Sequence, residues 1–435
     1  MLPLTGLVLF ELFEAEYGFA LQAHLPFLFE GTLNAAADIR VKFYELVGKI
    51  IARNYTKQLS DWCRAQGGKF SGHYLSEEYM SSHVKDYGSY VEVLKASDIP
   101  GIDVLFCYPE IYDYNTVKFP QMVARKKGVP NMMVEVCPFY NIETFNKDPI
   151  ENIMGVMGLL YLGGVRIAHS YFAADYTEYG FTDMKGYMNK AEANKYNEYV
   201  SRLGYMLDGL VDDCNTFLYY GIEDVQGKTR PAHSSADGPE READQRTKHI
   251  GRRIYEAGFN FLYADGADIA EAANSLKSGG TALISGICVK TIIIPGIDVI
   301  KGEALVALDK LQNAGVNVLF LAKLPQLGLD LQEDISTHIN PFKVSSEEDI
   351  LTHLRKCENI FCAEGASILK ARYNKFGQEM WFVLNNSREN ARVHFEHKEK
   401  SEANLYNPAD GNVSKIEMGS TVEVLSFRGV FLVFE

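Results

Sequence analysis

The stretch Gly128-Val-Pro-Asn-Met-Met-Val-Glu-Val-Cys-Pro-Phe-Tyr-Asn141 decides the predicted fold. Residues 132–136 form an apolar run of strand length between turn signals at Pro130 and Pro138, which indicates a short buried strand. Glu135 interrupts this run. A carboxylate near the end of a buried strand is costly unless it is paired, hydrogen-bonded or facing a polar cleft. An ion pair with an Arg or Lys would satisfy it, but the aromatic and polar residues 138–141 favour a binding cleft.

The chain before and after this strand alternates between helix and strand patterns. Residues 7–65 are predicted to be mostly helical, because apolar side chains recur every three to four positions until the glycine pair at 67–68. Strand patterns then follow at 69–74, 104–108, 132–136 and 165–171. The intervening segments are long enough for crossover helices, so the pattern predicts parallel βα units like those of a TIM barrel.

Polar and aromatic side chains cluster where these strands end. One parallel sheet brings all its carboxyl ends to the same rim, where such side chains can surround a polyhydroxylated ligand. Glu135 is the predicted catalytic residue. The predicted substrate contacts are His73, Glu77, Glu78, Asp103, Tyr108, His169 and Tyr171.

Structural explanations remain open for several of these residues. His73 and His169, each taken alone, fit a hydrogen-bonded core histidine. The pair at 77–78 fits an exposed helix start, where carboxylates complement the helix dipole. Asp103 fits a turn residue at the start of a strand beginning at residue 104.

Composition narrows the possible partners. The 435 residues carry a formal net charge of −14, and no Lys/Arg-rich tract stands out, so nucleic acid and anionic membranes are not expected partners. The 7 cysteines include no CxxC pair, which argues against a disulfide framework and a structural zinc site. No stretch reaches about 18 uncharged apolar residues. A cytoplasmic location is therefore expected, unless a further N-terminal segment precedes this sequence.

Two more domains are predicted after a first domain at 1–214. Residues 215–371 alternate strand and helix patterns, as in a small doubly wound α/β domain. Within it, 226–245 is predicted to be a polar loop, and 302–314 a helix ending at Gly315. Residues 372–435 show short alternating strands separated by turn signals, which predicts an antiparallel β-sandwich.

Several short motifs, in this order, resemble the α-L-rhamnosidase-type glycoside hydrolases of family 106. More loosely, the chain is similar to β-galactosidases with an amidotransferase-like middle domain. The motifs are Asp61-Trp-Cys63, Gly72-His73 with Glu77-Glu78, Pro100-Gly-Ile-Asp103, the strand containing Glu135, and Gly164-Val-Arg-Ile-Ala-His169. The resemblance implies a TIM barrel in which Glu135 matches the base or nucleophile, and a middle domain with an amidotransferase-like fold but not its chemistry.

The chain departs from this family in the number of βα units. Only four are readable before residue 215, whereas eight close a barrel. Glycosidases need two carboxylates, and the strand on which the family carries its acid has no counterpart here. The predicted fold is thus a partial TIM barrel containing the late βα units. Its open edges would favour association, so the chain is expected either to form a homo-oligomer through an edge or to cover that edge with its N-terminal helices.

The predicted function is hydrolysis of glycosidic bonds in plant or microbial polysaccharide. The alternative is a catalytically inactive carbohydrate-binding or assembly protein that retains the sugar cleft. No cofactor is assigned; calcium is a candidate, because an oxygen-rich cleft can hold it. A third hypothesis, nucleophilic cysteine chemistry in the middle domain, would require a reactive Cys288.

Overall fold

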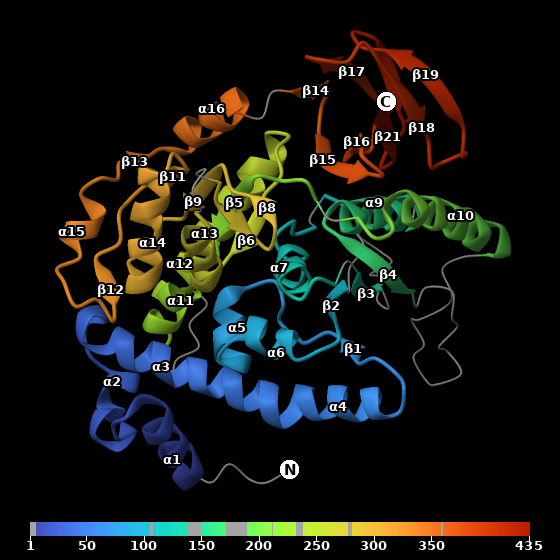
Figure 1. Ribbon diagram of the computed structural model, residues 1–435. Helices are drawn as coiled ribbons and strands as arrows, with labels where there is room; N and C mark the ends of the chain where they lie inside the picture. The colour runs from blue at the N-terminus through green and yellow to red at the C-terminus, as the bar shows by residue number, and fades with distance from the viewer. Residues whose placement is uncertain are drawn as a thin grey trace.

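A computed structural model describes residues 6–104, 108–110, 112–129, 131–136, 149–170, 189–210, 212–231, 238–276, 281–357 and 360–435. The chain has three parts: N-terminal helices with a parallel sheet, a second parallel α/β unit, and an antiparallel β region at the C-terminus (Figure 1). Among the described helices, none has the length and apolar character needed to cross a membrane.

The first sheet is parallel, with its four strands in sequence order: β1 (Ser71–Gly72), β2 (Ile99–Val104), β3 (Met132–Val136) and β4 (Val165–Ser170). The connecting helices are α5 (Met80–Tyr87), α6 (Tyr90–Lys95), α7 (Lys118–Lys126) and α9 (Pro149–Leu162). Helix α10 (Lys190–Leu207) follows β4 and packs on α9. This is the arrangement of consecutive βα units, and the described strands do not close a barrel.

The third predicted strand is confirmed, and the fourth is confirmed to within one residue. The second predicted strand, 104–108, lies mostly outside the described residues, and the described strand β2 covers Ile99–Val104 instead. The apolar run of 104–108 concealed the real strand, which contains Pro100 and Gly101 and so shows a weak strand pattern. As a result, Asp103 lies near the end of β2, not before its start.

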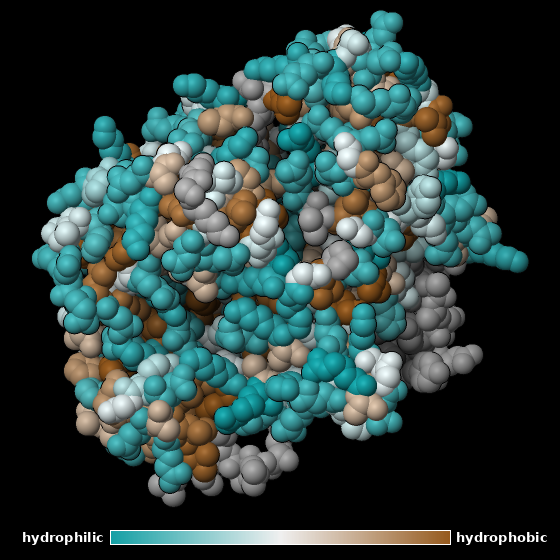
Figure 2. Space-filling model, in the orientation of Figure 1, coloured by the Kyte–Doolittle hydropathy of each residue, from teal (hydrophilic) through white to brown (hydrophobic). Residues whose placement is uncertain are grey.

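The predicted N-terminal helices are confirmed. They are α1 (Gly6–Tyr17), α2 (Leu25–Phe29), α3 (Leu33–Ile51), a π-helical turn η2 (Ala52–Thr56) and α4 (Lys57–Ala65), with a short 3-10 turn η1 (Leu21–His24) before α2. Ser60 on α4 donates a hydrogen bond to the Ala96 carbonyl at 2.6 Å, and Arg64 pairs with Asp98 at 2.5 Å, next to the β1 side of the sheet. Figure 2 shows a mainly hydrophilic face with hydrophobic side chains gathered over the N-terminal helices.

The second unit contains a parallel sheet of order β13-β11-β9-β5-β6. Its strands are β5 (Thr216–Tyr219), β6 (Leu262–Ala264), β9 (Thr291–Ile294), β11 (Asn317–Leu321) and β13 (Val344–Ser345). Two small pairs accompany it: β7 (Leu283–Ile284) with β8 (Ile287–Cys288), and β10 (Val299–Lys301) with β12 (Leu327–Leu329). Its helices are α11 (Ile222–Lys228), α12 (Pro239–Glu256), α13 (Gly266–Ser275), α14 (Gly302–Asn313), α15 (Ser336–Ile339) and α16 (Glu347–Cys357).

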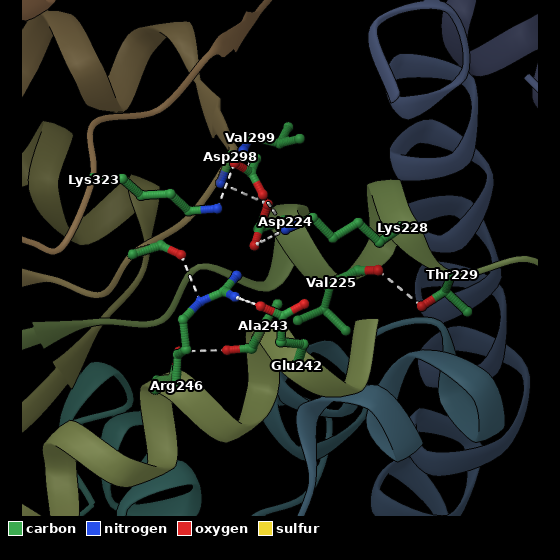
Figure 3. Close-up of polar contacts among 12 residues, drawn as sticks. Asp224, Val225, Lys228, Thr229, Glu242, Ala243, Arg246, Asp298, Val299 and Lys323 are labelled. Atoms are coloured by element: carbon green, nitrogen blue, oxygen red, sulfur yellow. Dashed lines mark hydrogen bonds and ion pairs between the residues drawn. The ribbon is translucent and has the colours of Figure 1, made fainter. Parts of the chain in front are cut away.

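A buried ion network ties α11 to the chain around β10 (Figure 3). Lys228 donates to Asp224 and to Asp298, each at 2.7 Å, and Lys323 donates to Asp298 at 2.6 Å. The second oxygen of Asp224 accepts the backbone N–H groups of Asp298 and Val299. These bonds satisfy carboxylates that would otherwise be costly to bury.

The prediction of a polar loop at 226–245 was wrong, because α12 begins at Pro239. Proline at the first helical position suits a helix start, since its missing N–H would have no partner there. Charged residues make up much of this helix and apolar residues are few, so a search for apolar side chains does not single it out in the sequence.

The C-terminal region is antiparallel, as predicted. One sheet has the order β14-β17-β20 and the other β15-β16-β21-β18-β19. The strands are β14 (Phe361–Glu364), β15 (Ile368–Lys375), β16 (Gln378–Asn385), β17 (Ala391–His397), β18 (Glu402–Tyr406), β19 (Val413–Glu417), β20 (Thr421–Val424) and β21 (Gly429–Phe434). Their inner side chains, among them Trp381 and Phe395, form a separate core.

Gly88 controls the packing of α3 against α5 and should not tolerate a side chain. It adopts φ 69°, and an added Cβ would lie 2.3 Å from the Tyr44 carbonyl oxygen. We expect Gly88→Ala to lower the free energy of unfolding by at least about 3 kcal/mol, from backbone strain plus overpacking. Gly67→Ala is the matched control: φ is 80° with nothing within 4 Å of the added Cβ, so only the strain of about 1–2 kcal/mol applies. Urea unfolding measures both, and equal losses would contradict the packing argument.

Candidate active site

The candidate site lies on the face of the first sheet opposite the buried side chains of Ile102, Val134 and Val136. Successive side chains in a strand point to opposite faces, so Asp103 and Glu135 both project from this second face. Asp103 is the register partner of Glu135, and Glu135 is the register partner of His169. Parallel pairing therefore places the three side chains in one row across β2, β3 and β4.

His73, which follows β1, extends this row. Its Nε2 lies 3.3 Å from Glu135 Oε2, and its Nδ1 lies 3.6 Å from Glu77 Oε1. One ligand atom each from His73, Asp103 and Glu135 lies within 4.8 Å of the others. Two carboxylates and an imidazole thus share one small volume, and all three side chains are half-buried.

Glu77 fixes the backbone beside this cluster. Its side chain is buried, and it accepts the N–H of Tyr74 at 2.8 Å and the N–H of Asp103 at 2.7 Å. Burial raises the pKa of Glu77 well above its ordinary value, although the two N–H groups oppose the shift. Glu77 therefore links the segment after β1 to the end of β2.

Asp103 differs electrostatically from an ordinary surface carboxylate. Burial, with a further contribution from the negative charge of Glu135, raises the pKa of Asp103 to about 6, while His73 opposes the shift. One of its oxygens, Oδ1, is buried without a hydrogen-bond partner among the described residues. Asp103 thus carries a proton under mildly acidic conditions and has an oxygen available for a ligand.

His73, Asp103 and Glu135 are also the described residues that could hold a cation. Asp103 Oδ1, which has no hydrogen-bond partner among the described residues, and His73 Nε2, which faces Glu135, are compatible with such a role. An imidazole with two carboxylates suits transition metals such as Mn²⁺ or Zn²⁺, whereas calcium takes oxygen ligands. The donor set therefore fits the suggested calcium less well than it fits these ions.

The remaining predicted site residues differ in their exposure. Glu78 is exposed at the rim, and His169 is exposed on β4. Tyr108 is 3% exposed and belongs to the main hydrophobic core. Tyr171 and the polar segment 138–141 lie outside the described residues.

A cavity of about 610 Å³ opens beside Asp103 and extends to α12. Its lining includes Tyr79, Tyr112 and Tyr114, together with Arg241, Lys248 and Arg252 of α12. Sequence reasoning misses this wall, because it predicts a loop where α12 lies. Two features of the sequence could have indicated this helix. They are the Gly-Pro pair at 238–239, which suits a helix start, and the acidic and basic residues that follow at four-residue spacing.

No protein-family model matches the chain, and no curated protein matches its sequence. Among solved structures, it is similar to the rhamnosidase from Novosphingobium sp. PP1Y, with a TM-score of 0.68 and 16% identity. The match covers 98% of this chain but 43% of that enzyme.

Two further solved structures agree with this likeness. The β-galactosidase from Bacillus circulans sp. alkalophilus matches with a TM-score of 0.65 at 9% identity, over 94% of this chain and 70% of that one. The α-L-fucosidase isoenzyme 2 from Paenibacillus thiaminolyticus matches with a TM-score of 0.55 at 12% identity, over 92% and 72%. The chain therefore has a glycoside hydrolase-like fold.

Proposed function

We propose that the chain is the catalytic part of an O-glycosidase that acts on plant or microbial polysaccharide, with an α-L-rhamnoside as the first substrate to test. The observation that carries the proposal is the pairing of Glu135 with Asp103 at the carboxyl ends of adjacent parallel strands. Catalytic residues of barrel enzymes occupy such positions, and glycosidases use two carboxylates.

The two carboxylates have different protonation behaviour, which suggests different roles. Glu135 would act as the nucleophile, with one oxygen attacking the anomeric carbon as the glycosidic C–O bond breaks. Asp103, whose pKa is raised to about 6, would give its proton to the departing oxygen. The Asp103 carboxylate would then take a proton from water, whose oxygen attacks the anomeric carbon and releases Glu135.

The short distance between the two groups favours this double-displacement route. The nearest ligand oxygens of Asp103 and Glu135 lie within 4.8 Å of each other. Carboxyl groups about 5–5.5 Å apart are typical of retaining enzymes, whereas inverting enzymes need roughly 6.5–9.5 Å to admit water. We therefore propose retention of the anomeric configuration.

The neighbouring residues would position these groups and the sugar. His73 contacts Glu135, and Glu77 holds the Asp103 backbone. Glu78, exposed shortly before α5, and His169, exposed near the end of β4, would contact sugar hydroxyls. The predicted contacts from Tyr108 and Tyr171 remain predictions; for Tyr108, contact would require a change in its buried packing.

Replacing Glu135 tests the nucleophile. On a panel of aryl glycosides that includes α-L-rhamnosides, we expect Glu135→Gln to lower kcat/KM by at least about 1,000-fold. Glu423→Gln, an exposed carboxylate on β20, is the control and should leave kcat/KM unchanged. Sugar binding without turnover in the unmodified protein would instead support the inactive carbohydrate-binding alternative.

The leaving group tests the role of Asp103. Removing a general acid should matter most when the departing oxygen needs a proton. We expect Asp103→Asn to lower kcat/KM by about 100-fold or more for a poor leaving group such as an alkyl glycoside. The loss for a dinitrophenyl glycoside should be below about 10-fold, because that group departs as an anion without needing a proton. Equal losses for both substrates would assign Asp103 to sugar binding.

The pH profile provides an independent test of the same carboxyl group. The proposed acid must be protonated in the free enzyme, so kcat/KM should fall as pH rises through about 6. Asp103→Asn should remove this basic limb for the alkyl glycoside, whose departing oxygen needs the proton, while the dinitrophenyl glycoside should show little of the limb in either protein. Persistence of the same limb in the variant would show that another group controls it.

A further inference from the structure

The cavity beside Asp103 has a cationic wall in a chain whose net charge is −14. Arg241, Lys248 and Arg252 come from α12 at spacings of seven and four residues, so they lie on one side of the helix. The lining of the same cavity includes Asp103, which belongs to the candidate active site. A ligand that reaches the catalytic carboxylates could therefore extend to α12.

Two of these cations are stacked on one aromatic ring. The guanidinium carbon of Arg241 lies 3.3 Å, and the Lys248 nitrogen 3.6 Å, from the centroid of the Tyr79 ring. Lys248 also forms an ion pair with Asp113 and donates to the Glu78 carbonyl at 2.9 Å. Lys248 is thus largely satisfied within the protein, and its main role is to hold the cavity wall.

The two arginines keep unused donors. Arg252 donates from Nε to Glu256 at 2.8 Å, and its two terminal nitrogens have no further hydrogen bond among the described residues. Among the described residues, Arg241 uses one terminal nitrogen, which donates to Ser81 and Asp244 at 3.3 and 3.5 Å. A guanidinium presents several N–H groups in a plane that matches carboxylate and sulfate oxygens.

A buried hydroxyl among the lining residues is also unsatisfied. Thr116 lines the cavity and is 3% exposed, yet its Oγ1 has no hydrogen-bond partner among the described residues. A buried hydroxyl without a partner is costly unless a water molecule or a ligand completes it. Thr116 therefore points independently to a polar ligand in this cavity.

We propose that this cavity binds an anionic substituent of the substrate, so that the preferred glycan carries a carboxylate or a sulfate ester close to the cleaved bond. Arg252 and Arg241 would contact the anionic oxygens, and Thr116 would donate to one of them. Three acidic residues also line the cavity. Lys248 already neutralises Asp113, solvent screens the charge of the exposed Glu78, and Asp103 belongs to the adjacent candidate active site. The proposal rests on the proposed glycosidase function, because it assumes that a glycan occupies the adjacent site.

Equilibrium binding to the full chain carrying Glu135→Gln tests the proposal without turnover. Calorimetric titrations would compare neutral, uronic-acid-containing and sulfated oligosaccharides of equal length. We expect at least one acidic class to bind about 10-fold more tightly than the neutral one, with the preference weakening as salt increases. The uronate and sulfate arms identify which anion is recognised.

Replacing one arginine at a time locates the contact. Adding Arg252→Gln should remove most of the acidic preference while changing neutral binding by less than about 2-fold. Arg253→Gln is the matched control, because Arg253 neighbours Arg252 on the helix but does not line the cavity. Circular dichroism checks that both variants remain folded.

The outcomes separate this proposal from the glycosidase proposal. Equal binding of neutral and acidic glycans, no binding of any acidic glycan, or equal effects of the two arginine variants would overturn the anionic site, even if aryl glycosides are hydrolysed. Acidic binding that depends on Arg252, without hydrolysis of any glycoside by the unmodified chain, would support the anionic site and reject the glycosidase.

Discussion

The in-register parallel pairing of β2, β3 and β4 is the constraint on which the candidate site depends. It aligns Asp103, Glu135 and His169 in one row, although about thirty residues separate each from the next in the sequence. A shift of one residue in either pairing would turn a carboxylate toward the buried face. Glu77 accepts a hydrogen bond from the Asp103 N–H on the β1 side of this row. One buried carboxylate therefore holds the backbone that carries another.

The environment of each carboxylate follows from its distance to solvent and to the other charges. Glu77 is completely enclosed and is stabilised by two N–H donors in place of a cation. Asp103 is less enclosed than Glu77. Its partial burial and the nearby negative charge of Glu135 both favour its protonated form. Two like charges in one small volume do not ionise with equal ease, which is how an enzyme can give two carboxyl groups different chemical roles.

The second α/β unit supplies one wall of the cavity beside the candidate site. Its helix α12 packs against α5 and α11, so that one of its sides faces the segment after β2. Buried ion pairs around Asp224 and Asp298 hold α11 in place, and α11 in turn contacts both α12 and α3. The cavity next to the candidate site is therefore bounded by residues more than one hundred positions apart in the sequence.

Much of the fold could be predicted from the sequence, because residues 132–136 and the C-terminal strands have clear apolar patterns between turn signals. Glu135 could be identified because it interrupts such a pattern. The pairing of Asp103 with Glu135 could not, because β2 contains Pro100 and Gly101, and the more apolar run after it concealed its boundaries. Tyr108 illustrates the same error: a position expected at a strand end is packed in the core. Helix α12 was missed because charged residues dominate it and few of its residues are apolar.

The π-helical turn Ala52–Thr56 has a consequence for the edge of the first sheet. A π turn accommodates one more residue than an α turn, so each residue of α4 is rotated by about 100° from where an uninterrupted helix would place it. Ser60 and Arg64 reach Ala96 and Asp98 with this offset in place. The single extra residue thus sets which side of the long N-terminal helix meets the sheet. A homologous chain shorter by one position here would present different side chains to that edge.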